Sequence, residues 1–284
     1  MDSQKKGQLM MVICATLWST SGVVMKYIDL SPFLIGGGRA VFSTLTIAGS
    51  MIIAGNRIKV TKQALISMLV CFANLLGFVI ANKLTTAANA IVLEYWAPIY
   101  IILALWIFWK EKPEKYELGF VGVCFLGMVL FFMDQISMDG IWGNLLAIFA
   151  GANMGTMYII NGKIKYDNER MTAIVLGHAL TAVVGVSIGI MQTSSSDVTL
   201  TPILLIIALG IFQMGIPYIL YGRAAAMISP VAVSLINMIE PILNQIWVAL
   251  FYGEKPGIWA LVGAVIIICA VGAYSVIDAK KAKE

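Results

Sequence analysis

The sequence predicts an all-α membrane protein of ten transmembrane helices that form two inverted five-helix repeats. The first observation is composition: 60% of the 284 residues are hydrophobic, 12% are charged, and the mean hydropathy is +0.90. A soluble protein with so few polar residues cannot cover its surface, whereas a bilayer needs no such cover. The second observation is the length of the apolar segments, and the third is a segment that the chain contains twice.

Ten apolar runs of about 16 to 23 residues follow one another along the chain, and this is the length that an α-helix needs to cross a bilayer. The first five are Leu9–Tyr27, Pro32–Ala54, Gln63–Ala81, Ala87–Trp109 and Leu118–Met133. The second five are Ile141–Ile160, Ala173–Met191, Leu200–Tyr221, Val231–Phe251 and Ile258–Ile277. The loops between them are too short for a soluble domain. We therefore expect two five-helix repeats, residues 1–137 and 138–284.

The repeated segment is an apolar helix with a proline in mid-span and a charged stop. Ile91–Lys112 and Ser234–Lys255 align so that Pro98 matches Pro241, and the motif EKP follows each copy. Because each half has an odd number of helices, the second half must enter the membrane upside down relative to the first. Inverted repeats of this kind are the architecture of many alternating-access transporters, with a substrate site near the membrane midplane.

The Lys and Arg residues predict the orientation. With a cytoplasmic N-terminus, most of the 19 basic residues lie in cytoplasmic segments, and only Lys83 and Lys255 lie in outer loops. The positive-inside rule therefore places both termini in the cytoplasm of a multi-pass protein of the cell (inner) membrane. The net charge of +4 comes from these short flanking runs and not from a basic patch, so no nucleic-acid partner is expected.

No cofactor or metal site is expected. The four cysteines lie singly in different apolar segments without a CxxC pair, which indicates core packing. They are Cys14, Cys71, Cys124 and Cys269. Gly36–Gly38 precede Arg39, but the phosphate-loop pattern GxxxxGK[ST] is absent, so nucleotide binding is not expected. We expect Arg39 to pair with a carboxylate or to extend its charge outward.

Each copy of the repeated helix has a carboxylate deep in its apolar run, Glu94 in the first and Glu240 in the second. Such a group costs about 2.5 to 3.5 kcal/mol on insertion scales and usually faces a bundle interior or a watery cavity. We expect both acids to contact the solute and to carry protons in exchange for it. The alternatives are a packing network around Glu240, and a pairing of Glu94 with Arg39 or Lys83.

Helix 9 offers a polar face around the second acid. Asn237, Glu240 and Asn244 are spaced three and four apart and so share one face of a helix. Pro241 removes a backbone donor and frees a carbonyl one turn back. This face could bind a cation or an ammonium group; a helix-packing role is the alternative.

Aromatic and amide side chains complete the predicted site, because an aromatic cavity with a few amides holds a flat or cationic solute by stacking and cation–π contact. The candidates are Trp18, Ser19, Asn74, Phe78, Tyr95, Asn153, Tyr158, Gln213 and Tyr218. For any single aromatic, packing or a place at the membrane interface is the competing interpretation. His178, the only histidine, is expected to pack within its helix.

The order and spacing of these features resemble the EamA branch of the drug/metabolite transporter superfamily. The matching features are the two five-helix halves, Trp18-Ser19, Arg39, Pro98, and Ile239-Glu240-Pro241 before Gly253-Glu254. The resemblance covers almost the whole chain, but Glu94 departs from the family pattern. The resemblance implies a central cavity lined chiefly by helices 1, 3, 4, 6, 8 and 9, with helices 5 and 10 peripheral. It also implies export, or sometimes uptake, of amino acids, other small metabolites or drugs.

We therefore expect a secondary transporter that exports a small organic metabolite, such as an amino acid or an organic cation, by alternating access and without catalysis. Its expected partners are the small-molecule substrate, the lipid bilayer and protons, and the expected state is a monomer. A flippase for a lipid-linked small molecule is the main alternative, although it needs basic residues at membrane depth and only Arg39 is available. An intramembrane enzyme that uses the two acids is a further alternative.

Overall fold

The computed structural model describes residues 2–25, 27–137, 139–194, 199–253 and 256–282. Throughout these ranges every regular element is a helix. Lys26, Asp197 and the second charged stop, Glu254-Lys255, lie outside the described residues. Eight spans are long and apolar enough to cross a membrane. With α3 and α7 they make up the ten helices that the apolar runs predict.

The helices of the first half are α1 (Ser3–Trp18), α2 (Ser21–Met25), α3 (Pro32–Ile53), α4 (Lys62–Leu84), α5 (Ala87–Glu94), α6 (Ala97–Trp109) and α7 (Lys115–Phe131). Those of the second half are α8 (Ile141–Lys163), α9 (Asp167–Gln192), α10 (Leu200–Ala208), the π-helix η2 (Leu209–Gly215), α11 (Ile216–Ala224), α12 (Pro230–Asn237), α13 (Ile239–Tyr252) and α14 (Ile258–Lys281). Four spans are interrupted: α1–α2, α5–α6, α10–η2–α11 and α12–α13. We number the spans 1 to 10 in chain order.

Prolines explain where spans 4 and 9 break. A proline inside a helix removes one hydrogen bond, and its ring clashes with the carbonyl four residues earlier. For Pro98 that carbonyl belongs to Glu94, the last residue of α5, and for Pro241 it belongs to Asn237, the last residue of α12. The chain therefore breaks at the same point of both repeated helices, next to the predicted polar residues.

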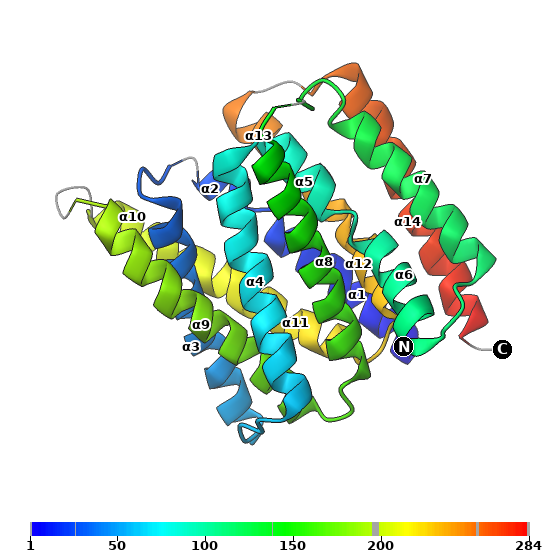
Figure 1. Ribbon diagram of the computed structural model, residues 1–284, viewed down its shortest axis with the longest axis horizontal. Helices are drawn as coiled ribbons and strands as arrows, with labels where there is room; N and C mark the ends of the chain where they lie inside the picture. The colour runs from blue at the N-terminus through cyan, green and yellow to red at the C-terminus, as the bar shows by residue number, and fades with distance from the viewer. Residues whose placement is uncertain (1, 26, 138, 195–198, 254–255, 283–284) are drawn as a thin grey trace.

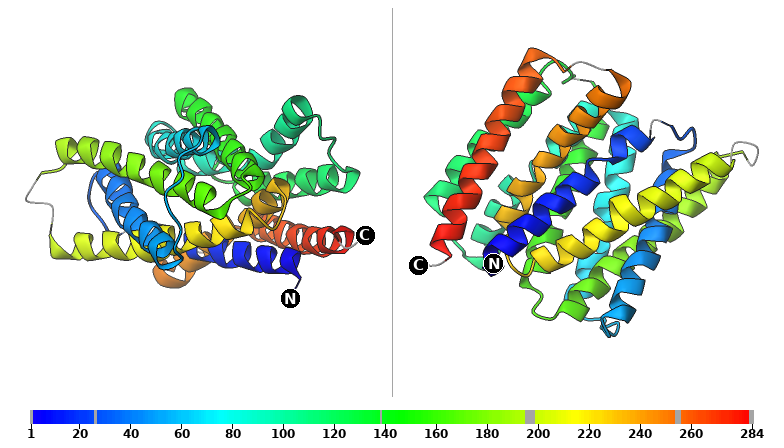
Figure 2. Two further views of the ribbon diagram at one scale, coloured as in Figure 1. Left: turned by 90° about the horizontal axis from the view of Figure 1, so that it is seen from below. Right: turned by 180° about the vertical axis from the view of Figure 1, so that it is seen from behind.

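The helices form a flat bundle whose two chain ends lie on the same side (Figure 1). At one edge α7 packs along α14, and toward the other edge α3 packs along α9, with α4 between α8 and α9 (Figures 1 and 2). Spans 5 and 10 are thus peripheral. The broken spans 1, 4, 8 and 9 and the long helix α8 form the middle of the molecule, where the largest cluster of buried apolar side chains lies.

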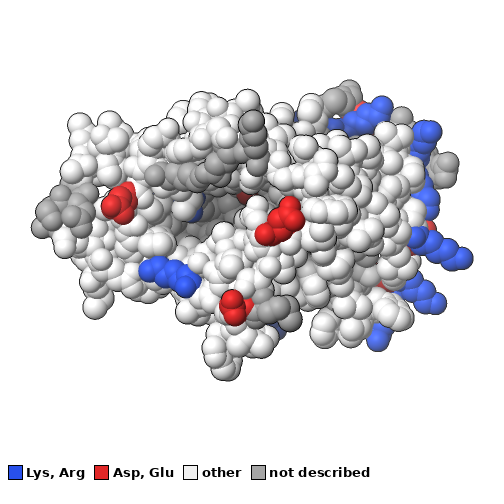
Figure 3. Space-filling view, turned by 90° about the horizontal axis from the view of Figure 1, so that it is seen from above, with Lys and Arg blue, Asp and Glu red and all other residues white. Residues whose placement is uncertain are grey.

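We call the side that carries both termini the basic side, because Lys and Arg residues gather at its helix ends. Among them are Lys62, Lys115, Lys163, Arg223 and Lys281. In the space-filling view from the top of Figure 1, basic residues lie mostly along one edge, and the surface is hollowed near its middle (Figure 3). This hollow opens away from the basic side.

Span 9 shows how the two sides differ in packing. Its basic-side half, α12, packs against α1, α6, α8 and α14, and every residue from Val231 to Asn237 is buried. Its other half, α13, packs mainly against α1 and α2, and its residues Glu240 and Asn244 are partly exposed. The bundle is therefore closed around span 9 on the basic side and looser on the opposite side.

Candidate functional site

Glu94 ends α5 and lies in the interior, with 8% of its surface exposed. Its Oε1 accepts a 2.7 Å hydrogen bond from Asn74 Nδ2 of α4, and the same amide donates to the carbonyl of Ala150 in α8 at 3.2 Å. Gly151 packs so closely that a Cβ there would lie 2.5 Å from the Glu94 carbonyl oxygen. The first acid is thus held where spans 3, 4 and 6 meet.

Neither alternative partner of Glu94 contacts it in the described part of the chain. Lys83 places its Nζ 5.2 Å from the centre of the Phe33 ring, and Arg39 donates to Gln213 and Met25. A neutral amide, Asn74, is therefore the partner of the first acid. The carboxyl group of Glu94 thus has no counter-charge among the described residues.

Glu240 lies in the first turn of α13 and is partly exposed. Tyr95, the residue after Glu94, donates a 2.7 Å hydrogen bond from its hydroxyl to Glu240 Oε2. Asn237 Nδ2 donates to the Tyr158 hydroxyl at 3.2 Å and to the Tyr95 hydroxyl at 3.5 Å. Spans 4, 6 and 9 thus meet in one polar cluster at the two helix breaks.

An aromatic wall continues from this cluster toward spans 1 and 8. The ring of Tyr158 lies 5.3 Å from that of Tyr221, and Trp18 meets Tyr218 edge-on at 5.1 Å. Gln213 Nε2 donates to the Trp18 carbonyl at 3.1 Å. The wall combines five buried side chains of spans 1, 6 and 8, and these side chains have both aromatic faces and polar tips.

The remaining predicted residues lie around this cluster or apart from it. Ser19 accepts a 2.9 Å hydrogen bond from Trp247 Nε1, and Asn244 is packed against Gly22, where a Cβ would lie 2.2 Å from Asn244 Oδ1. Phe78 packs against a small cluster of alanines between spans 3, 4 and 6. Asn153 donates to the carbonyl of Phe149 in its own helix at 2.8 Å. The structure thus does not join these last two to the polar cluster.

Sequence reasoning did not single out a second polar network, which lies nearer the basic side. Asn161 donates to the Tyr221 hydroxyl at 2.9 Å and accepts from Ser67 at 2.9 Å. Arg170 Nε donates to the Asn161 carbonyl at 2.8 Å, although Arg170 is only 3% exposed. Asn161 directly follows the predicted run Ile141–Ile160, so the criterion that found Glu94, a polar residue inside an apolar run, did not apply to it.

His178 takes the packing role that the sequence predicts. Its Nδ1 lies 2.9 Å from the Ser43 hydroxyl, and its ring meets Tyr218 at 4.2 Å between centres. Within the described ranges its Nε2 has no hydrogen-bond partner, and the same holds for Trp18 Nε1. Both atoms lie beside the aromatic wall.

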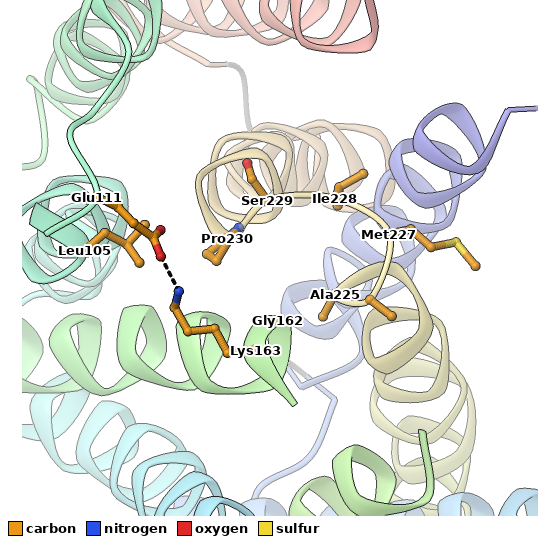
Figure 4. Close-up of a pocket in the computed structure, with 10 residues that line it drawn as sticks. Leu105, Glu111, Gly162, Lys163, Ala225, Met227, Ile228, Ser229 and Pro230 are labelled. Carbon is orange, nitrogen blue, oxygen red and sulfur yellow. Dashed lines mark hydrogen bonds and ion pairs between the residues drawn. The ribbon is translucent and has the colours of Figure 1, made fainter. Parts of the chain in front are cut away.

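A pocket of about 320 Å³ opens on the basic side (Figure 4). It is lined by Leu105, Glu111, Gly162, Lys163 and residues 225–230. Lys163 Nζ and Glu111 Oε1 form a 2.5 Å ion pair at its wall. Tyr158, Asn161 and Tyr221 form a buried layer beside this pocket, because Asn161 precedes the lining residue Gly162 and donates to the Tyr221 hydroxyl. The fold therefore has a recess on each side.

Ten helices with interior acids between two recesses define a multi-pass membrane protein of the transporter class. The family model of the EamA-like transporter family matches the chain twice, at residues 5–133 and 141–276. The chain therefore belongs to the EamA-like transporter family, as the resemblance predicted.

Relatives carry the same general description. An uncharacterized transporter of Archaeoglobus fulgidus is 26% identical over 68% of each chain. The uncharacterized transporter YxxF of Bacillus subtilis is 22% identical over 92% of this chain and 86% of its own, and one of Clostridium kluyveri is 25% identical over 93% and 91%. A solved crystal structure superposes with a TM-score of 0.82 over 97% of this chain and 99% of its own at 14% identity, which shows the shared fold.

Proposed function

We propose that this transporter is a secondary exporter of a small organic metabolite, such as an amino acid or an organic cation. The solute site opens alternately to the hollow, which faces away from the basic side, and to the pocket on the basic side. The driving force is a gradient of protons or of the solute itself. In this proposal residues 1–137 and 138–284 are the two repeats that move against each other, as in other inverted-repeat transporters.

The observation that carries the proposal is the placement of Glu94 and Glu240. The first is held by the neutral amide of Asn74 and the second by the hydroxyl of Tyr95, so neither acid is neutralised by a cation among the described residues. An ionisable group at membrane depth is usually part of a substrate or proton pathway. We propose that both acids bind the solute and that protons exchange with it there.

The second support is the asymmetry around span 9. Its basic-side half is buried among α1, α6, α8 and α14, while Glu240 and Asn244 on the other half are partly exposed. We propose that this is the state open to the outside, with both termini in the cytoplasm of the cell membrane. Rocking of the halves then breaks the layer of Tyr158, Asn161 and Tyr221 and opens the 320 Å³ pocket.

The test is solute exchange by the purified protein in proteoliposomes. Amino acids, primary amines and quaternary ammonium compounds are first screened by thermal shift, because a ligand of the folded form raises its stability. Compounds that stabilise the protein are then loaded into vesicles, and counterflow of the labelled compound is measured against protein-free vesicles. The proposal predicts saturable exchange of at least one class. Stabilisation by no compound and exchange of none would contradict it.

A further inference from the structure

Arg39 is a partly exposed cation within span 2 that the proposed mechanism has not used. Its Nη1 donates to Gln213 Oε1 at 3.2 Å and contacts Met25 Sδ at 3.5 Å. In the ranges that the structure describes it forms no ion pair, and its Nε has no hydrogen-bond partner. A guanidinium has five N–H donors, and an interior charge without a counter-charge is costly. Arg39 therefore has both the donors and the energetic need for an anion.

The surrounding structure fixes the backbone of α3 near Arg39 and the amide partner of its side chain. Gly37 packs so tightly against α9 that a Cβ there would lie 2.3 Å from the Val186 nitrogen. Gln213 is oriented at both ends of its amide, because its Oε1 accepts from Arg39 while its Nε2 donates to the Trp18 carbonyl. A cation held by a close helix contact and an oriented amide is preorganised to receive a ligand.

There is room for a small group beside Arg39. A cavity of about 30 Å³ lies between α3, α4, α9 and η2, and Arg39, Phe33, Thr181 and Met214 are among its lining residues. About 10 to 15 Å³ measured with a water-sized probe is enough for one water molecule. The cavity can therefore take a water molecule or a small anionic group next to the guanidinium.

Arg39 contacts one end of the aromatic wall, and the polar cluster of Glu240 contacts the other. Gln213 joins Arg39 to Trp18, whose ring packs on Tyr218. The wall continues through Tyr221 to Tyr158, which accepts a hydrogen bond from Asn237 of the polar cluster. Trp18 Nε1 is a second donor without a partner in the described part of the chain. The space-filling view shows both basic and acidic atoms inside the hollow (Figure 3). A series of side-chain contacts thus connects Arg39 with Glu240.

We propose that Arg39 binds the carboxylate of the transported solute. The proposal rests on the transport function proposed above and narrows it from any small organic metabolite to one that carries a carboxylate. The planar guanidinium matches a carboxylate with two parallel hydrogen bonds, which a Lys ammonium cannot do. An amine without a carboxylate would leave Arg39 unpaired and bind more weakly.

The test uses matched pairs of probes on the full-length protein. L-phenylalanine is compared with 2-phenylethylamine, L-leucine with isopentylamine, and L-lysine with cadaverine, by thermal shift and by counterflow in proteoliposomes. We expect at least one amino acid to bind at least tenfold more tightly than its amine. In Arg39→Gln this preference falls below about twofold, and Arg39→Lys restores it only in part. Arg223→Gln, an exposed arginine on the basic side, is the matched control and keeps the wild-type preference.

Each outcome separates this inference from the transport function. If amines are exchanged as well as the amino acids, or if Arg39→Gln keeps the preference, transport stands and the role of Arg39 is wrong. If O-phosphoethanolamine binds and none of the amino acids does, Arg39 binds a phosphate and the carboxylate assignment is wrong. If no probe binds or exchanges, both proposals fail. If Arg39→Gln does not fold, the affinities of the wild-type protein for each amino acid and its matching amine still test whether a carboxylate is required.

Discussion

Tyr95 and Glu240 join the two halves of the molecule, because the Tyr95 hydroxyl of span 4 donates a 2.7 Å hydrogen bond to the Glu240 carboxylate of span 9. Tyr95 directly follows Glu94, so a movement of either acid is transmitted to the other through one residue. The bond also lies at the two proline breaks, where the backbone can bend without losing further hydrogen bonds. It is thus placed to couple solute binding to the movement of the halves.

Tyr95→Phe removes this hydrogen bond and keeps the ring. A hydrogen bond to a charged group contributes about 1.5 to 3 kcal/mol, and loss of the hydroxyl leaves Glu240 with one partner fewer. We expect solute exchange to fall by about tenfold or more while the protein still folds. Counterflow and thermal unfolding of the purified variant measure the two effects. Tyr100→Phe, a hydroxyl deletion on α6, is the control, and an equal loss there would contradict the assignment.

Gly151→Ala tests how tightly the first acid is held. The new Cβ would lie 2.5 Å from the carbonyl oxygen of Glu94, which is backbone and cannot turn away. Overpacking of this kind destabilises by about 1 to 3 kcal/mol. Gly122→Ala is the matched control, since nothing lies within 4 Å of its new Cβ. Thermal unfolding in detergent should show a lower transition for Gly151→Ala only; equal transitions would mean that α8 does not fix Glu94.

Cysteine labelling tests which side of span 9 is open. Asn244 is partly exposed on α13, whereas Ala232 on α12 is fully buried. In a background without the exposed Cys269, a membrane-impermeant thiol reagent should label Asn244→Cys quickly and Ala232→Cys slowly. Similar labelling rates at the two positions would rule out the one-sided opening.

Asn161→Ala tests the layer that closes the basic side. The substitution leaves the Tyr221 and Ser67 hydroxyls without this partner in a buried setting. Each unsatisfied buried group costs about 1 to 3 kcal/mol. Because only the closed state contains these bonds in our account, the variant should expose the basic-side pocket more often. Reaction of Ala225→Cys with a thiol reagent from the basic side should then become faster in the Asn161→Ala background, and an unchanged rate would contradict the role of the layer.

Span length and order could be predicted from the sequence because they depend on apolar runs alone. The first residue of a helix was harder to predict where the helix begins with polar residues. α9 begins at Asp167, before the predicted Ala173, because Asp167 and Glu169 in its first turn stabilise the helix N-terminus. α7 begins at Lys115, before the predicted Leu118, through a capping box between Glu114 and Glu117. An apolar-run criterion ignores both effects.

The site was partly predictable for a similar reason. Glu94, Asn237 and Glu240 stand out as polar residues beside mid-span prolines, and the structure brings Asn237 and Glu240 together around Tyr95, the residue after Glu94. Their partners depend on depth and rotation across helices distant in sequence, so the bonds from Asn74 to Glu94 and from Tyr95 to Glu240 could not be read from spacing. The expected carboxylate partner of Arg39 is replaced by Gln213 for the same reason.

The rate of solute exchange by the variant Glu94→Gln tests the central claim, which is that an acid inside the membrane spans is required for transport. Its amide oxygen can still accept the bond from Asn74 Nδ2, so the variant should fold with a nearly unchanged unfolding temperature. Asp134→Asn, an exposed acid on the opposite side, is the matched control and should behave as the wild type. In proteoliposomes we predict that Glu94→Gln loses at least nine-tenths of the exchange rate and all accumulation driven by a proton gradient. Wild-type exchange and wild-type proton-driven accumulation by this variant would contradict the account.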